Sequence, residues 1–255
     1  MRYLLLLAAV LVAGPAAADQ FKLESAVLKE TRVINVYTPP AYGGEARFPV
    51  LYMPDGGLEE DFPHVSATID AAIKAGEMRP LILVGIENTE RRRDMTGPTE
   101  VESDRKIAPR VGGSAAFRRF IADELMPQVR SRYRTTDETA IIGESLAGLF
   151  IVETFFLEPE LFDTYIALSP SLWWNKEELV GKTAERLKAQ PNLRATLFLS
   201  SAGDDVGPEA GRLAEILRAQ APAGLKWQYK PRPDLRHDNI YRSSAPQVLR
   251  ELFAP

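Results

Sequence analysis

Short apolar segments alternate with longer amphipathic segments along most of this 255-residue chain. The apolar segments are predicted strands at residues 49–53, 81–86, 139–143, 164–169, 195–201 and 225–230. The amphipathic segments are predicted helices at residues 64–77, 114–131, 146–157, 176–189, 208–219 and 244–252. Two earlier strands, 22–28 and 31–39, are separated by a polar break and predict an opening hairpin. This alternation predicts an α/β fold with a mainly parallel sheet, an N-terminal antiparallel hairpin and helices on both faces.

The first residues have the pattern of a secretory leader. Arg2 precedes an apolar run at residues 4–12, and Ala16 and Ala18 form the small-x-small pattern that signal peptidase requires. The run is shorter than the roughly 20 residues that a helix needs to span about 30 Å of hydrocarbon. We therefore predict a signal peptide over residues 1–18, cleaved after Ala18, and a periplasmic or secreted protein without a membrane span.

Composition narrows the classes of function. Residues 19–255 number 237, which is compatible with a single domain. The chain has no cysteine, which excludes disulfides and thiolate nucleophiles or ligands. Without the leader, 30 basic residues face 35 acidic ones, which argues against a nucleic-acid partner. Neither HExxH nor GxxxxGK[ST] is present, so we predict no metal and no other cofactor.

The segment IIGESLAGLF, residues 141–150, joins a predicted strand to a predicted helix. It contains most of a Gly-x-Ser-x-Gly pattern, in which the serine lies on a sharp turn between strand and helix. The fifth position of the pattern is Ala147, and Gly148 follows one place later. Functional groups of parallel sheets gather beyond the carboxyl ends of the strands, where Ser145 is predicted to lie. Ser145 is therefore the candidate nucleophile, and an ordinary serine near a helix start is the alternative.

A serine hydroxyl needs a base to accept its proton and an acid to orient that base. His237 is the candidate base, because it is the only histidine after the serine and lies in a polar loop after the last predicted strand. The other histidine, His64, is predicted to be structural. Two adjacent carboxylates, Asp204 and Asp205, follow the strand before that one, and either can supply the acid. Asp205 is favoured over Asp204, and Glu209 is a third choice.

The negative oxygen that develops during attack on an ester needs backbone N–H donors. One predicted donor is Leu146, the residue after the candidate nucleophile. The other is predicted in the turn MPDGGL, which supplies Gly56 and Gly57. Glycine permits the close approach that such a turn needs, and Gly57 is favoured over Gly56.

Longer stretches now show a family resemblance. The segments LYMPDGG, GIENTERRRDMTG, FIADELMPQVRSRYRTT, IIGESLAGLF and FDTYIALSPSLWWN occur in this order. In sequence and spacing the chain resembles the putative-esterase family of α/β-hydrolases, and within it the enterochelin (siderophore) esterase branch. The resemblance covers roughly residues 20–253. It implies an α/β-hydrolase fold, with Ser145 as nucleophile, His237 as base, and the amides of Gly57 and Leu146 as oxyanion donors.

Three positions depart from the family pattern. Glu144 precedes the serine where the family usually has histidine, and Ala147 stands where it usually has glycine. The sequence around the base is His237-Asp238-Asn239, whereas relatives often have a His-Gly-Ser-like stretch. None of these departures removes a predicted catalytic group.

Aromatic and basic residues near the predicted site suggest a substrate class. Trp173 and Trp174 follow the strand after the serine helix and are predicted to form an aromatic wall suited to a catechol. The alternative is that both fill the gap between helix and sheet. Arg91 and Arg93, in the run Arg91-Arg92-Arg93, are predicted to hold an anionic substrate, with a solvated face as the alternative.

These observations together predict an exported serine esterase that cleaves a small-molecule carboxylic ester through an acyl-enzyme. A catecholate siderophore of the enterochelin type is the leading candidate substrate. An acetyl, feruloyl or general carboxylesterase would use the same groups. A non-catalytic binding module on a hydrolase scaffold, or an acyl transferase, would also be compatible with the sequence.

Overall fold

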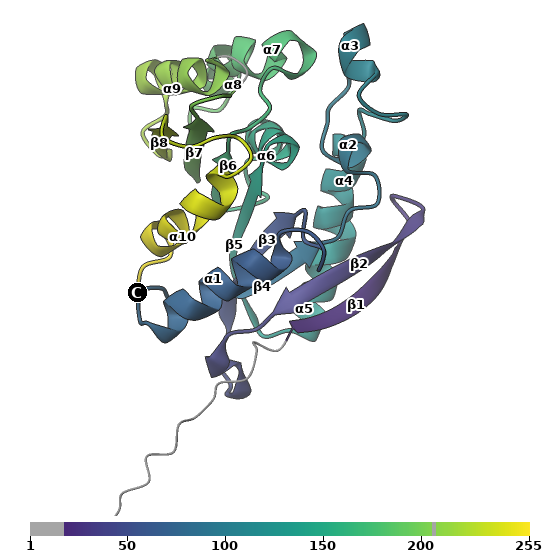
Figure 1. The fold of residues 1–255 in the computed structure, drawn as a ribbon, viewed down its shortest axis with the longest axis vertical. Helices are drawn as coiled ribbons and strands as arrows, with labels where there is room; N and C mark the ends of the chain where they lie inside the picture. Colours follow the sequence, from purple (N-terminus) through teal and green to yellow (C-terminus); the bar gives the residue numbers. More distant parts are fainter. Residues whose placement is uncertain (1–17, 206–207) are drawn as a thin grey trace, which may run out of the picture.

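An eight-stranded sheet, in the order β1-β2-β4-β3-β5-β6-β7-β8, forms the centre of the molecule (Figure 1). The computed structural model describes residues 18–205 and 208–255, so the predicted leader falls outside the described residues except for Ala18. The strands are β1 (Ala18–Ser25), β2 (Glu30–Tyr37), β3 (Phe48–Pro54), β4 (Ile82–Ile86), β5 (Thr135–Glu144), β6 (Thr164–Leu168), β7 (Thr196–Ala202) and β8 (Lys226–Arg232). The β1–β2 and β2–β4 pairs are antiparallel, and the remaining pairs are parallel. The predicted hairpin and mainly parallel sheet are therefore confirmed.

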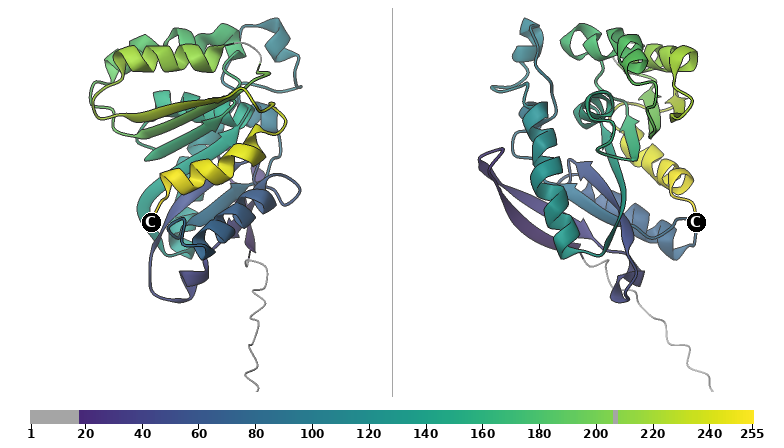
Figure 2. Two further views of the ribbon diagram at one scale, coloured as in Figure 1. Left: turned by 60° about the vertical axis from the view of Figure 1, so that its left-hand side comes forward. Right: turned by 180° about the vertical axis from the view of Figure 1, so that it is seen from behind.

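Helices cover both faces of this sheet. On one face lie α1 (Phe62–Lys74) and α10 (Ile240–Leu252), in front of the sheet in Figure 1. The right-hand view of Figure 2 shows the other face. Its helices are α4 (Ser114–Arg119), the π-helical segment η2 (Phe120–Leu125), α5 (Met126–Arg132), α6 (Leu146–Leu157), α7 (Trp174–Gly181), α8 (Thr183–Ala189) and α9 (Glu209–Gln220). The remaining short helices are η1 (Pro40–Gly43), α2 (Arg91–Asp94) and α3 (Glu102–Arg105).

The central strands are buried on both sides, which explains their continuous apolar sequences. In β3, Val50 and Tyr52 pack in the core under α4–α9, whereas Leu51 and Met53 pack in the core under α1 and α10. Successive side chains of a strand point to opposite faces, so one apolar run supplies both cores. Among the residues that the structure describes, no helix is both long enough and apolar enough to cross a membrane.

Three helix predictions need correction. The segment predicted as one helix over 176–189 is divided into α7 and α8 near Gly181, a residue that is unfavourable inside helices. The helix predicted over 114–131 contains the π-helical segment η2, which lies directly before Met126-Pro127, where proline lacks an N–H for the helical ladder. The last helix starts at Ile240 instead of residue 244. Serines before a proline are typical of a helix start, but here Pro246 lies inside α10.

Candidate active site

A sharp turn between β5 and α6 carries Ser145. Its backbone has φ 58° and ψ −118°, in the left-handed region that non-glycine residues rarely adopt. Two hydrogen bonds to the neighbouring strand and its loop hold this conformation: Ser145 N donates to Leu168 O at 3.1 Å, and Ser171 N donates to Ser145 O at 3.0 Å. Strained backbone of this kind is maintained only where the surroundings enforce it. The predicted strand–turn–helix geometry around Ser145 is therefore present.

Ala147, one departure from the family pattern, fits in this turn because Gly143 faces it. A Cβ added to Gly143 would lie only 2.6 Å from the Cβ of Ala147. The alanine methyl therefore occupies the space that a side chain at position 143 would take. Gly148 is also close-packed, since a Cβ there would lie 3.0 Å from Cα of Pro170.

The hydroxyl of Ser145 begins a chain of hydrogen bonds that joins three loops. Ser145 Oγ is 3.0 Å from Nε2 of His237, and Nδ1 of His237 is 2.8 Å from Oδ1 of Asp205. A carboxylate can only accept, so Nδ1 carries the proton of the neutral ring and Nε2 is free to accept the hydroxyl proton of Ser145. This is the arrangement that activates a serine for nucleophilic attack.

The two adjacent aspartates have different contacts. Oδ2 of Asp205 accepts hydrogen bonds from Ser169 Oγ at 2.9 Å and from Ala202 N at 2.7 Å, so both oxygens of Asp205 are engaged. Oδ1 of Asp204 instead accepts the backbone N–H of His237 at 2.6 Å. Asp205 therefore contacts the imidazole and Asp204 anchors the loop that carries it. The third choice, Glu209, lines the same cavity and faces Arg212 at 3.8 Å.

The surrounding carboxylates shift the proton affinity of His237. The hydrogen bond to Asp205 raises the pKa of His237 above its ordinary value, and the charges of Glu144, Asp205 and Asp204 act in the same direction. Partial burial of the ring opposes this shift. The imidazolium form is consequently favoured relative to a free histidine.

The predicted oxyanion donors differ in availability. Leu146 is the first residue of α6, so its N–H has no acceptor within the helix. The N–H of Gly57 donates to Oε2 of Glu60 at 2.7 Å, and the same carboxylate accepts from Nδ2 of Asn88 at 2.8 Å. The Gly57 donor is thus engaged by a carboxylate of the chain itself. Gly56 packs so tightly against β4 that a Cβ there would lie 2.3 Å from backbone atoms.

A cavity of about 290 Å³ opens beside Ser145 and His237. Trp173 lines this cavity and is half-buried, as predicted for one wall. Trp174 does not line it: its ring is buried in the core, and its Nε1 donates to Gly97 O at 2.9 Å. The tryptophan pair is therefore divided, with Trp173 at the cavity and Trp174 buried in the core and bonded to the loop at Gly97.

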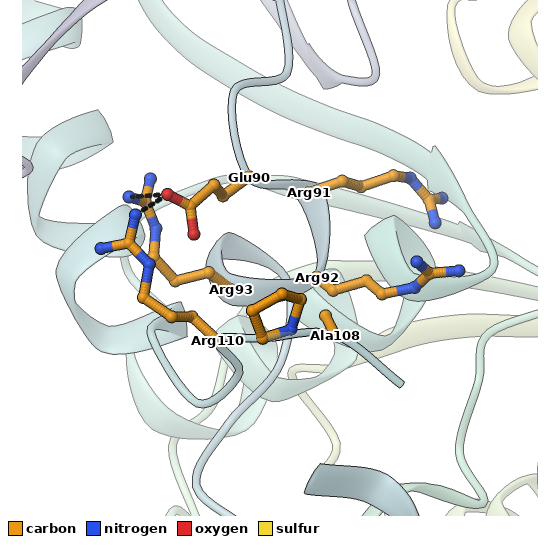
Figure 3. A pocket seen from close by; sticks show the side chains of 7 residues that line it. Glu90, Arg91, Arg92, Arg93, Ala108 and Arg110 are labelled. Atoms are coloured by element: carbon orange, nitrogen blue, oxygen red, sulfur yellow. Dashed lines mark ion pairs between the residues drawn. The ribbon is translucent and has the colours of Figure 1, made fainter. Parts of the chain in front are cut away.

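A second hollow of about 560 Å³ lies over α2, and we call it the arginine pocket. Its lining residues are Glu90, Arg91, Arg92, Arg93, Ala108, Pro109 and Arg110. In Figure 3, Arg91 and Arg92 extend to one side, whereas Arg93 and Arg110 approach Glu90 on the other.

Carboxylates of the chain already hold both of the arginines that were predicted to bind substrate. Arg91 donates to both oxygens of Asp55, at 2.7 and 2.9 Å. Arg93 donates to both oxygens of Glu30, at 3.0 and 2.7 Å, and to Asp94 at 2.7 Å. Arg92 is exposed and extends beside Arg91 (Figure 3). Of the three arginines, Arg92 therefore has the most accessible guanidinium.

Sequence reasoning missed two serines at the site. Ser169 bonds Asp205, and Ser171 Oγ is 3.3 Å from Ser145 Oγ. Both follow β6, the strand beside the serine strand, and could have been found from the rule that strand ends meet at one edge. The contact of Glu144 with His237, at 3.0 Å from Oε1 to Nε2, was also missed, since it depends on a loop 93 positions later.

A sheet with this strand order and a serine elbow after β5 defines the α/β-hydrolase class, in which serine, acid and histidine follow one another along the chain. The chain belongs to the family described as "Putative esterase", whose model matches residues 25–223. Membership of this family agrees with the resemblance found in the sequence.

Known relatives lie among siderophore esterases. The ferri-bacillibactin esterase BesA of Bacillus subtilis is 32% identical over 179 residues, which are 60% of this chain and 59% of BesA. The iron(III) salmochelin esterase of Escherichia coli O6:H1 is 29% identical over 50% of this chain and 29% of that protein. This chain therefore spans less than two thirds of the length of these curated relatives. The crystal structure of an IroE-like serine hydrolase from Shewanella oneidensis has a TM-score of 0.83 and 29% identity, covering 93% of this chain and 80% of that chain.

Proposed function

We propose that this protein is a serine esterase that hydrolyses carboxylic esters of a small molecule, with a catecholate siderophore as substrate. The observation that carries the proposal is the hydrogen-bonded series from Ser145 Oγ through His237 to Asp205. Membership of the esterase family supports the ester bond as the target.

In the first half of the reaction, Ser145 Oγ attacks the ester carbonyl carbon while its proton passes to Nε2 of His237. Asp205 holds the ring through Nδ1 and stabilises the imidazolium that forms. The tetrahedral intermediate then expels the alcohol, which takes the proton from Nε2. The acyl group remains on Ser145.

In the second half, water attacks the acyl-serine and its proton passes to Nε2 of the same histidine. Collapse of this second intermediate releases the carboxylic acid, and His237 returns the proton to Ser145. The N–H of Leu146 is the proposed donor to the negative oxygen in both intermediates. Gly57 is the proposed second donor, and the carbonyl oxygen of the substrate would replace Oε2 of Glu60 on its N–H.

The siderophore assignment is supported by the relatives and by two side chains. BesA and the salmochelin esterase are named for iron-siderophore substrates. Trp173 offers an aromatic face in the cavity beside Ser145, on which a catechol ring can pack. Arg92, beside Arg91 in the arginine pocket, offers an exposed guanidinium to an anionic ligand.

The test is hydrolysis of a short p-nitrophenyl ester and of ferric and iron-free catecholate trilactones. We expect Ser145→Ala and His237→Ala each to lower kcat by about 10⁴-fold to 10⁶-fold, because the groups act as a unit. Ser131→Ala is the matched control, since this exposed hydroxyl bonds only a carbonyl of α5. Turnover of p-nitrophenyl, acetyl or feruloyl esters without turnover of trilactones would replace the siderophore assignment with a general esterase. Equal rates for the wild type and both variants on every ester would reject catalysis and favour a binding module.

The proposal includes export, on the basis of the leader pattern in residues 1–18. We expect mass spectrometry of the exported chain to find Asp19 at its N-terminus. A full-length chain that stays in the cytoplasm would contradict this part of the proposal.

A further inference from the structure

Glu144 places a second carboxylate against the catalytic face of His237. It is the last residue of β5, directly before Ser145, and its side chain is 17% exposed. Its Oε1 lies 3.0 Å from Nε2 of His237, the same distance as Ser145 Oγ. Among the described residues, this buried Oε1 has no hydrogen-bond partner. An unpartnered carboxylate oxygen therefore faces the nitrogen that would accept the serine proton.

The electrostatic surroundings of Glu144 come from several elements. Burial raises the pKa of Glu144 to about 7, against the lowering effect of nearby cations. The groups that act on it are His237 and Arg91, which lower the pKa, and Asp55 and Asp61, which raise it. Burial raises the pKa of the Tyr241 phenol, from α10, and the charge of Glu144 acts in the same direction. On the side of His237, the other acting groups are Asp205 and Asp204.

The protonation state of His237 decides whether Glu144 is attracted to it. When Glu144 is ionised and the ring is neutral, the proton of the ring is on Nδ1 and the lone pair of Nε2 faces the lone pairs of Oε1, so no hydrogen bond forms between them. In the imidazolium, Nε2 carries a proton and a positive charge 3.0 Å from Oε1. An ionised Glu144 therefore stabilises the charged ring selectively.

We propose that Glu144 is a positioning residue whose carboxylate holds the charged ring of His237 from its Nε2 face during the base step. The inference rests on the proposed function, because it gives Glu144 a part in the base step. During attack the proton moves from Ser145 Oγ to Nε2, and Glu144 neither gains nor loses one. Asp205 and Glu144 then hold the imidazolium from its two nitrogens. The same attraction stabilises the protonated free enzyme and moves the loss of activity in acid to higher pH.

The histidine content of the chain allows a direct measurement. The chain has two histidines, His64 and His237, so ¹⁵N-histidine-labelled protein gives two imidazole signals, and His64→Gln assigns them. We expect Glu144→Gln to lower the pKa of His237 by about 1 unit or more, as for loss of an opposite charge within hydrogen-bond distance. Glu144→Ala is predicted to act in the same direction, and Glu144→Asp, which keeps the charge, is predicted to retain part of the raised pKa.

Glu209→Gln is the matched control, because it makes the same chemical change in the same cavity and Glu209 is not among the groups with the largest effect on His237. It should leave the His237 titration within about 0.2 unit of the wild type, well below the effect of a contacting charge. Kinetics give the second measurement. In Glu144→Gln the acid limb of kcat/KM should move down by the same amount as the pKa, kcat on the plateau should fall by up to about tenfold, and KM should stay unchanged.

The outcomes separate the two proposals. An unchanged His237 pKa in both Glu144→Gln and Glu144→Ala overturns the role of Glu144, whether or not the wild type hydrolyses esters. A lowered pKa with a shifted acid limb supports it. A lowered pKa in a protein that hydrolyses no ester supports the Glu144–His237 pairing and rejects the esterase assignment.

Discussion

The cavity beside Ser145 and the arginine pocket over α2 both contain several charged groups, but the two hollows differ in how these groups contact one another. In the arginine pocket, Arg91 and Arg93 are each held through two or more hydrogen bonds by carboxylates of the chain. In the cavity, the contacts run in one line from Asp205 through His237 to Ser145, which lines the open space.

This difference shows that the number of charged residues around a hollow does not indicate whether those residues are available to a substrate. The arginine pocket is the larger, yet most of its charge is neutralised internally and serves to fix the segment after β4. In the proposed mechanism the substrate supplies the partner of Ser145, whose hydroxyl is presented on a strained turn. Ion pairs within the chain hold the arginines of the arginine pocket, whereas the contacts from Asp205 to Ser145 suit the chemistry proposed for the cavity.

The largest effect on activity is expected from replacing Asp205, the aspartate that contacts the ring of His237. Asp205→Asn should lower kcat by about 10⁴-fold, because an amide can hold the ring in the wrong tautomer and cannot stabilise the imidazolium. Asp204→Asn should lower it by less than about tenfold, since Asp204 bonds the backbone of His237. Steady-state kinetics on one ester compare the two. Equal losses of kcat in the two variants would mean that Asp204 is as important for His237 as Asp205.

In the arginine pocket, the expected effect is on stability. Arg93→Ala should lower the free energy of unfolding by about 2–4 kcal/mol, because it leaves Glu30 and the buried Asp94 with fewer partners. Arg92→Ala, at an exposed neighbouring position, should change it by less than about 0.5 kcal/mol. Urea denaturation measures both. If Arg92→Ala proves as costly as Arg93→Ala, the internal pairing described for this pocket is incorrect.

A smaller stability effect is expected at the serine turn. Gly143→Ala should lower the free energy of unfolding by about 1–3 kcal/mol, because the new methyl would lie 2.6 Å from that of Ala147. Adding Ala147→Gly, which restores the usual family residue, should recover most of the loss. Thermal melts of the single and double variants provide the measurement. If the double variant is no more stable than Gly143→Ala alone, a contact other than that with Ala147 excludes a side chain at position 143.

The smallest effect concerns pH. In the proposed mechanism, attack requires neutral His237, and the hydrogen bond to Asp205 raises the pKa of this ring. Activity should therefore fall as pH decreases through a value above about 6.5, the pKa of an unperturbed histidine. The profile of kcat/KM between pH 5 and 9 gives the midpoint. A midpoint below 6.5 would mean that burial of the ring outweighs its carboxylate neighbours.

Part of this site could be predicted from the sequence, because the predicted strands fix which loops lie at the same edge of the sheet. Ser145, His237 and the two aspartates each follow a predicted strand, and the ends of parallel strands meet at one edge. The sequence favoured Asp205 over Asp204, but the contacts that distinguish them are visible only in the structure, because adjacent side chains in a turn diverge. The pairing of Arg93 with Glu30 was also out of reach, since these residues are 63 positions apart.

The tryptophans and the helix boundaries show a second limit. Trp173 and Trp174 are chemically identical neighbours, yet one lines the cavity and the other is buried. Their division depends on how the chain turns between β6 and α7, which local propensity does not encode. The start of α10 was missed for a related reason, because burial of Ile240 and Tyr241 favours a helix that begins before Pro246.

The position of β8 at the edge of the sheet links the reactive chemistry to local unfolding. β8 pairs with β7 alone, and its residues are largely exposed or half-buried. The loop after β8 brings His237 to Ser145, which lies 92 positions earlier in the sequence, so this contact depends on a loop that leaves an edge strand. We expect fraying of this edge to separate His237 from Ser145 while the two cores remain packed. Activity should then be lost in mild denaturant before the whole protein unfolds, and amide hydrogens of β8 should exchange with solvent before those of β3 and β5.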